Sequence, residues 1–376
     1  MVSSRWTVSS LLAVGCVLGV ACSEEVKNRG TPLDITNLDG GTGMETGPAF
    51  DPDDLDHDGY TPATGDCDES DPLKNPGAFE FVGNGIDDDC DKEIDEPPAD
   101  CDAVVGADAT DPELVAAAMN ICDKDKFLLE ARFVETNTRA DQRAIRATLG
   151  PIKPRAGKSF VMLSNGIAAG PMDMNFVEPG SGTSIGTKSP RPAAYADNPK
   201  CPKAGVDAMV NDLADIQVKL KAPTNAKSFR ISFRFLSGEY PQYFCSSYND
   251  AFAAVVRSTR YPGKNGKNVA YDSNGEFLGV NVAFWSICAN SEKYMGCTTD
   301  PSAMNGTGYG KSDKGGPHGA TDWVTTTVPV TPGETFTLRL AIWDESDGIL
   351  DSSIAIDDFR WEIEPTDQET TVVDPE

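Results

Sequence analysis

Residues 229–235 read FRISFRF, and residues 336–342 read FTLRLAI. Both stretches place an apolar side chain at every second position, with Arg, Ser or Thr between most of them. Because successive side chains of a β-strand point to opposite faces of its sheet, this period of two predicts two strands that each bury one face.

The same region holds further candidate strands, at 127–134, 159–163, 216–221, 251–256, 277–285, 323–330 and 353–363. One short helix is expected after Asp111, which has the residue type of an N-cap and is followed by Pro112 at the first helical position. The regular alternation of helices and strands that a parallel sheet needs is absent. We therefore expect a mainly β protein with an antiparallel, jelly-roll-like β-sandwich.

The charge balance bears on possible partners. The 376 residues include 32 Lys plus Arg against 59 Asp plus Glu, a net charge of −27 with His neutral. Such a chain repels phosphate backbones and anionic lipid surfaces, so we expect no nucleic-acid partner. With only His57 and His318 present, mechanisms that need several imidazoles are disfavoured.

The N-terminus predicts export. The apolar run at 8–21 is too short to span a bilayer and resembles a secretory signal peptide at 1–21. It ends in Gly19-Val20-Ala21-Cys22, which resembles a bacterial lipobox with Gly19 where Leu is usual, so Cys22 would be acylated. The alternative is an ordinary secretory peptide. Residues 22–50 are expected to form a flexible tether.

Eight cysteines remain if Cys22 is lipidated and Cys16 is removed with the signal peptide. An even number in an exported protein implies disulfides, although connectivity cannot be deduced from sequence. Local pairing favours Cys67 with Cys90, Cys101 with Cys122, and Cys288 with Cys297, which leaves Cys201 for Cys245. No CxxC motif is present, which disfavours a redox or zinc site.

Residues 51–102 contain 19 Asp plus Glu against two Lys, so they carry most of the net negative charge. The spacing Asp54-x-Asp56-x-Asp58-Gly59 matches the first half of an EF-hand loop, in which the next backbone carbonyl, here that of Tyr60, is also a ligand. Gly65 occupies the position of the closing Glu. The alternative is a solvated acidic linker.

This stretch resembles the MopE-type metal-binding motif of bacterial surface proteins, itself similar to thrombospondin type 3 calcium repeats. The resemblance is carried by DHDGY (56–60), GDCDESDP (65–72), NPGAFE (75–80) and NGIDDDCD (84–91). It implies a Cys67–Cys90 disulfide that staples a calcium-binding module over 51–100. The implied ligands are Asp54, Asp56, Asp58, Tyr60, Asp66, Asp68, Asp71, Asp87, Asp89 and Asp91. Copper is disfavoured because His57 is the module's only imidazole and alternates out of phase with the Asp ligands.

The remainder of the chain resembles the choice-of-anchor L domain of exported, often myxobacterial, proteins over about 103–364. The resemblance rests on LSNGIA (163–168), FRFLSGEYPQYFCSSYNDAF (233–252), HGATDW (318–323) and TPGETFTLRLAIWDESDGILDSSIAIDDFRW (331–361). Gly238 departs from the family pattern. The resemblance implies surface location and a β-sandwich over 101–364, and no established biochemical role. A disordered acidic tail is expected at 365–376.

Two polar groups of this domain are candidate sites. Strand alternation puts Asp357 on one inward face with Ala355, Phe359 and Trp361, where a carboxylate must be metal-bound or hydrogen-bonded. Asp351 or Asp347 would complete a calcium site there. Glu239, Asn249 and Asp250 lie among tyrosines and form either a ligand surface or a rigid oxygen-rich loop, and we favour the loop.

No catalytic constellation is predicted. Residues 182–186 fit G-x-S-x-G but lack the flanking strand and helix of a nucleophile elbow. Glu239 and Asp344 are the carboxylates that a glycosidase on this scaffold would use. We expect a lipid-anchored protein of the outer membrane or cell surface, with a calcium-stabilised module for binding or adhesion to a glycan or protein. The alternative is a surface polysaccharide hydrolase.

Overall fold

The computed structural model describes most of the chain after residue 50. The described residues are 51–97, 101, 106, 108–195, 201, 208–271, 275–281, 285–288, 297, 300–310, 318–366 and 369–373. The predicted signal peptide, the tether and Cys22 lie outside them. No helix within the described residues has the length and apolar character needed to cross a membrane.

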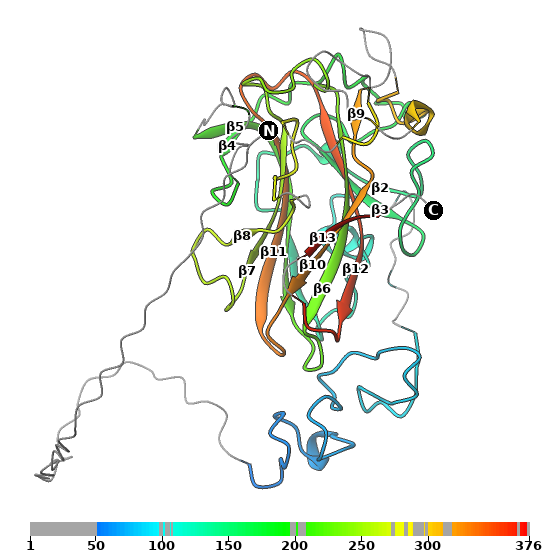
Figure 1. Ribbon diagram of the computed structural model, residues 1–376, viewed down its shortest axis with the longest axis vertical. Coiled ribbons are helices and arrows are strands. Elements are labelled where there is room, and N and C mark those ends of the chain that lie inside the picture. The colour runs from blue at the N-terminus through cyan, green and yellow to red at the C-terminus, as the bar shows by residue number, and fades with distance from the viewer. Residues whose placement is uncertain are drawn as a thin grey trace, which may run out of the picture. The chain divides into compact units, whose positions relative to one another are not determined.

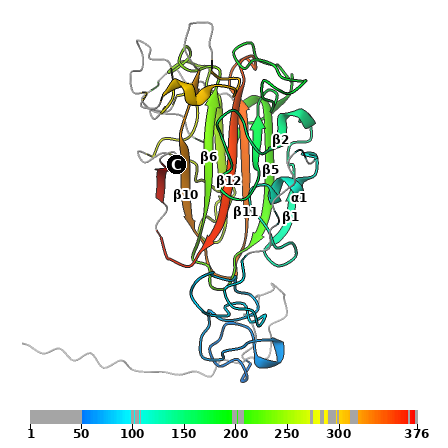
Figure 2. The ribbon, with the colours of Figure 1, turned by 90° about the vertical axis from the view of Figure 1, so that its right-hand side faces the viewer.

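Two antiparallel sheets make up the sandwich (Figures 1 and 2). The first has the strand order β1 (Leu128–Arg132), β5 (Met209–Lys221), β11 (Thr335–Asp344), β7 (Ala251–Arg257) and β8 (Lys267–Asn268), with β4 (Lys188–Pro190) also paired to β5. The second has the order β13 (Glu369–Val373), β10 (Trp323–Pro329), β6 (Ser228–Ser237), β12 (Ser352–Glu362), β3 (Phe160–Ser164) and β2 (Arg143–Arg146), with β9 (Gly319–Ala320) paired to β6. The mainly β sandwich predicted from the sequence is confirmed.

The main core lies between the sheets and is built from alternate residues, as the period of two predicts. Phe229 of β6 has no exposed surface and stacks on Phe336 of β11, with ring centroids 5.5 Å apart. A second apolar cluster covers the opposite face of β6 and β12, through Leu236 and Ala355. The central strands are therefore buried on both faces.

The helical segments are short. They are α1 (Pro112–Ala117) and the 3₁₀ turns η1 (Pro62–Thr64), η2 (Ala140–Gln142) and η3 (Pro301–Met304). The predicted cap of α1 is confirmed, because the Asp111 side chain accepts a hydrogen bond of 2.9 Å from the Glu113 N–H.

Two expectations about secondary structure were wrong. Within 277–285 the described residues, 277–281 and 285, form isolated bridges from Phe277 to Tyr271 and from Gly279 to Ala251, and none of these residues belongs to a strand. Part of the predicted disordered tail, Glu369–Val373, is strand β13, paired with β10. The alternation of apolar and polar residues cannot tell whether such a segment pairs as a strand, because the pairing depends on a partner that is distant in sequence.

Candidate metal centres in the acidic module

The first acidic cluster consists of Asp54, Asp56 and Asp58, each offering one oxygen within 4.8 Å of the others. The loop is shaped by its own side chains. Asp54 accepts a hydrogen bond from the Gly59 N–H (3.1 Å), Asp56 from the Asp58 N–H (3.3 Å) and Asp58 from the Tyr60 N–H (2.8 Å). Gly59, at φ +94°, provides the left-handed backbone that the turn needs. Tyr60 follows the turn, and the role of its carbonyl as a ligand stays a prediction.

The second oxygen of each of these carboxylates is buried without a hydrogen-bond partner. Asp66 and Glu69 repeat the pattern: one oxygen accepts a backbone N–H, from Asp68 (2.8 Å) and Leu55 (3.1 Å) respectively, and the other is buried and unpartnered. Buried oxygens that lack a donor are costly unless a cation binds them. The five unpartnered oxygens are therefore suited to a hard cation.

Electrostatics in this cluster support the same interpretation. Burial raises the pKa of Asp56 and of Asp58, and repulsion from the Asp66 carboxylate adds to both shifts. A bound cation would offset both effects because it stabilises the ionised form.

A second group of carboxylates surrounds Asp89. Glu80, Asp87 and Asp89 offer one set of oxygens within 4.8 Å of one another, and Asp89, Asp91 and Glu96 offer another. One oxygen of Asp89 and one of Glu96 are buried without a partner. The other Asp89 oxygen accepts a hydrogen bond of 2.7 Å from Lys126. Burial raises the pKa of Glu80 and of Glu96.

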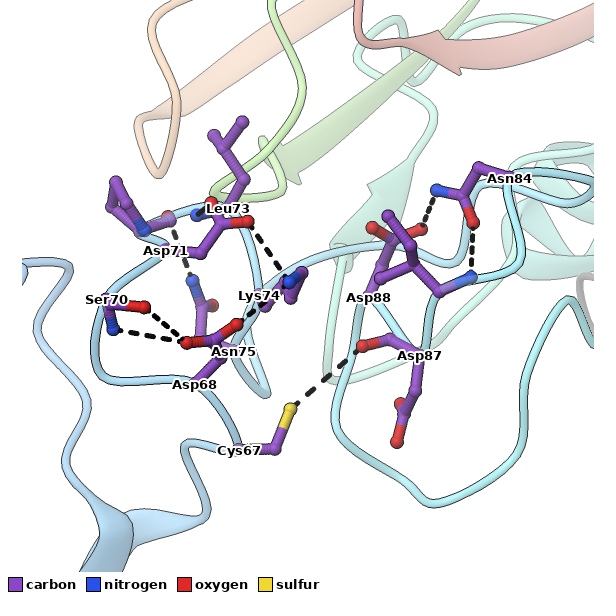
Figure 3. A network of polar contacts seen from close by, with 12 residues as sticks. Cys67, Asp68, Ser70, Asp71, Leu73, Lys74, Asn75, Asn84, Asp87 and Asp88 are labelled. Carbon is purple, nitrogen blue, oxygen red and sulfur yellow. Dashed lines mark hydrogen bonds and ion pairs between the residues drawn. The ribbon is translucent and has the colours of Figure 1, made fainter.

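Two residues of the predicted ligand set have a cationic side chain as a partner. Asp68 and Asp71 both contact the Lys74 ammonium, at 2.8 and 3.3 Å (Figure 3). Hydrogen bonds from Lys74 and Ser70 lower the pKa of Asp68 to about 2. An ammonium ion, and not a metal cluster, is thus the partner that the structure gives these two carboxylates.

Three glutamates were missed as candidates: Glu69, Glu80 and Glu96. Sequence reasoning followed the alternating aspartates, whereas these glutamates reach the clusters from other turns of the loop. The sequence did offer one signal, because Glu80 is the last residue of the NPGAFE stretch that carries the family resemblance. In the structure its two oxygens accept the Asp95 and Asp88 N–H groups at 2.9 and 3.0 Å.

Disulfides link Cys67 to Cys90, Cys101 to Cys122, Cys201 to Cys245 and Cys288 to Cys297. These are the pairs that local pairing favoured. The Cys67–Cys90 bond joins the two acidic groups directly, because Cys67 follows Asp66 and Cys90 lies between Asp89 and Asp91.

The module is held to the turn between β5 and β6. The Asn225 side chain donates to the Phe79 carbonyl (2.8 Å) and accepts from the Phe79 N–H (3.0 Å). Thr224 donates its N–H to Gly77 and its hydroxyl to Asn75, at 3.0 and 2.7 Å. These hydrogen bonds join the module to the sandwich, as does the ion pair between Lys126 and Asp89.

The candidate ligand surface of the sandwich is buried. Glu239, Asn249 and Asp250 are each at most 1% exposed. Asn249 accepts a hydrogen bond from the Asn281 N–H (3.0 Å), and Asp250 accepts one from the Ser352 hydroxyl (2.5 Å). This burial disfavours the alternative of an open ligand surface and agrees with the rigid, oxygen-rich loop that we favoured.

Asp357 is hydrogen-bonded and belongs to none of the acidic metal clusters found among the described residues. Its oxygens accept backbone N–H groups of Arg155 (2.5 Å), Ala156 (3.2 Å) and Asp358 (2.7 Å). The expected shared face was also wrong. Asp358 has φ +61° in a β-bulge, which moves Phe359 to the main core while Ala355 lies in the second apolar cluster.

Fold and site together define a disulfide-bonded β-sandwich domain that carries an acidic module with clustered carboxylates. The family model of the choice-of-anchor L domain matches residues 158–359, and the chain belongs to this family. A model named for the copper-binding MopE proteins and described as a "putative metal-binding motif" matches residues 66–96. No curated protein matches. Among solved structures, the K2 cleaved adhesin domain of Lys-gingipain is similar at 12% identity and a TM-score of 0.23, covering 62% of this chain and 88% of that one.

Proposed function

We propose that this chain is an exported surface protein whose acidic module binds calcium and whose sandwich binds a glycan or a protein at the cell surface. Membership of the choice-of-anchor L family and the four disulfides support export to the surface. In this proposal the protein is anchored in the outer membrane by a lipid on Cys22. The next residue, Ser23, is not the Asp that commonly retains lipoproteins at the inner membrane.

The observation that carries the calcium proposal is the set of five buried, unpartnered carboxylate oxygens on Asp54, Asp56, Asp58, Asp66 and Glu69. Calcium accepts six to eight oxygen ligands, whereas copper and zinc prefer imidazole and thiolate. His57 is exposed and lies outside the clusters, and Cys67 and Cys90 are bonded to each other.

The module also needs the ion for stability. Among residues 51–97 the only buried apolar side chain is that of Ala78, and Leu55 and Ile94 are 68% and 61% exposed. Small units without an apolar core are stabilised by disulfides or metals. Calcium would therefore hold this module in its folded form.

Titration calorimetry on the chain from Ser23 onward tests calcium binding. We expect saturable binding that is weakened at least tenfold at one class of sites in Asp56→Ala with Asp58→Ala. The matched control is Asp68→Ala with Asp71→Ala, which removes two carboxylates bound to Lys74 and should leave that class intact. Equal effects of the two double variants, or no saturable heat at millimolar calcium, would contradict the proposal.

The anchor and the ligand need separate measurements. Mass spectrometry of the native protein should find a diacylated Cys22 as its first residue, and a free N-terminus at Ser23 or later would exclude the anchor.

An array of glycans and surface proteins, probed with the chain from Ser23 onward, should show capture without turnover. Glycan cleavage that is lost in Glu239→Gln with the fold retained would instead support the hydrolase. The burial of Glu239 and Asp344 favours binding, since a polysaccharide cannot contact them.

A further inference from the structure

Three buried carboxyl groups lie at one end of the sandwich, at the ends of three strands that belong to both sheets. Glu239 follows β6, Asp250 directly precedes β7, and Asp344 ends β11. Because Trp343 pairs with Ala251 across β11 and β7, Asp344 and Asp250 are adjacent on neighbouring strands. Glu239 joins them from the opposite sheet, where one of its oxygens accepts the Asp250 N–H at 3.3 Å.

All three side chains are at least 99% buried, yet none forms an ion pair with Lys, Arg or His among the described residues. Some other buried carboxylates of the sandwich do have such partners. Asp215 contacts Arg339 at 2.6 Å, and Glu345 contacts Arg191 at 2.8 Å.

Two oxygens in this group have no hydrogen-bond partner. They are Oδ1 of Asp250 and Oδ1 of Asp344, on side chains that are 100% and 99% buried. The other Asp250 oxygen accepts the Ser352 hydroxyl at 2.5 Å, which fixes the direction of the free one. These two buried oxygens could therefore accept a positive charge, and no cationic side chain among the described residues supplies one.

The three groups act on one another electrostatically. Burial is the largest cause that raises the pKa of Glu239 and of Asp250, and the next cause is the Asp344 carboxylate for Glu239 and the Glu239 carboxylate for Asp250. Like charges enclosed together are unfavourable unless they are neutralised, by protons or by a cation.

We propose that Glu239, Asp250 and Asp344 bind a divalent cation of the calcium type inside the sandwich, at a site separate from the acidic module. The donor atoms are all oxygens, which favours a hard cation. Their oxygens do not all lie within 4.8 Å of one another, so the carboxyl groups would turn toward the ion on binding, because two oxygens on one calcium ion lie at most about 5 Å apart. The ion would join β7 and β11 of one sheet to the end of β6 in the other.

Calcium counting by equilibrium dialysis tests this site in the chain from Ser23 onward. We expect Asp344→Asn to bind one equivalent fewer than the wild type and to keep the equivalents of the acidic module. The matched control is Asp357→Asn, which alters a carboxyl group equally buried but satisfied by three backbone N–H groups, and it should lose none. An unchanged count in Asp344→Asn would overturn the proposal and indicate that protons neutralise the cluster.

A second measurement does not depend on a variant that folds. Crystals of the wild-type chain soaked in terbium, a calcium substitute, should show an anomalous peak bonded to oxygens of Glu239, Asp250 and Asp344. Peaks at the acidic module without one at this site would overturn the inference and leave the proposed function intact. A peak here alone would support the inference and contradict the proposal for the module.

Discussion

The acidic module and the sandwich both contain many carboxyl groups, but they are stabilised by opposite means. The sandwich is formed around a continuous apolar core, and most of its buried carboxylates pair with Arg or with backbone N–H groups. The module exposes Leu55, Leu73, Val82, Ile86 and Ile94 and has almost no apolar interior. Five of its carboxylates accept a backbone N–H with one oxygen, and their other oxygen is buried without a hydrogen-bond partner: Asp54, Asp56, Asp58, Asp66 and Glu69.

This difference shows that the same residue type takes its role from its surroundings. Asp54 and Asp357 are both aspartates with limited exposure. Asp357 receives three N–H donors from the backbone around it, whereas Asp54 receives one, so only Asp54 retains an unpartnered oxygen for a metal. The number of donors available nearby separates a structural carboxylate from a candidate ligand.

The largest expected effect lies in the core. Phe229→Ala should lower the free energy of unfolding of the sandwich by about 3–5 kcal/mol, because the ring packs against Phe336, Phe359 and Trp361 and its loss leaves a cavity. Urea denaturation followed by tryptophan fluorescence measures this. Phe79→Ala, in the module, is the control. A loss of equal size there would contradict the view that the module lacks an apolar core.

Removal of the Cys67–Cys90 disulfide should destabilise the module alone, by less than Phe229→Ala destabilises the sandwich. Cys67→Ser with Cys90→Ser releases a loop with a sequence separation of 23, which corresponds to about 3 kcal/mol in the chain-entropy description. Limited proteolysis without calcium should then cleave residues 51–97 faster, while the melting temperature of the sandwich stays unchanged. A fall in that temperature equal to the one caused by Phe229→Ala would show that the two regions fold as one unit.

The carboxyl groups of the sandwich predict a pH dependence. Burial raises the pKa of Asp357 to about 7, above its value in the unfolded chain, so the folded protein binds a proton that the unfolded chain has released. The resulting stabilisation is present below about pH 4 and is lost as the pH rises through 7. We expect the unfolding free energy to fall over this range and the slope to decrease in Asp357→Asn. An identical slope in the variant would assign the titration to another group.

The smallest expected effect concerns the helix cap. Asp111→Ala should destabilise the sandwich by about 1 kcal/mol, because it removes the acceptor for the Glu113 N–H at the start of α1. Asp111→Asn keeps an acceptor and is the matched control, with a loss well below that of the alanine variant. Thermal unfolding of both variants measures this difference. If Asp111→Asn lost as much stability as Asp111→Ala, the charge of Asp111 would be its stabilising feature.

Local patterns were sufficient for much of the fold and for part of the candidate site. The alternation at 229–235 and 336–342 predicted β6 and β11, since period two is a property of neighbouring residues. The Asp54-x-Asp56-x-Asp58-Gly59 spacing predicted the first acidic cluster, because a turn of this type is formed by residues within one loop. The spacing did not predict Glu69 as a candidate ligand, because Glu69 is linked to this loop by a hydrogen bond from the N–H of Leu55, a residue 14 positions earlier.

The sequence by itself therefore determined the β class of the domain, its disulfide-rich character and the acidic module, all of which depend on residues close along the chain. The tertiary structure decided which partner each carboxylate has. Lys74 forms ion pairs with Asp68 and Asp71. The bulge at Asp358 interrupts the strand alternation, from which we had predicted Asp357 and Phe359 on one face. The tertiary structure also decided that Asp344 lies near Asp250 and Glu239, because strand register and the packing of two sheets bring it to residues that are 94 and 105 positions earlier in the chain.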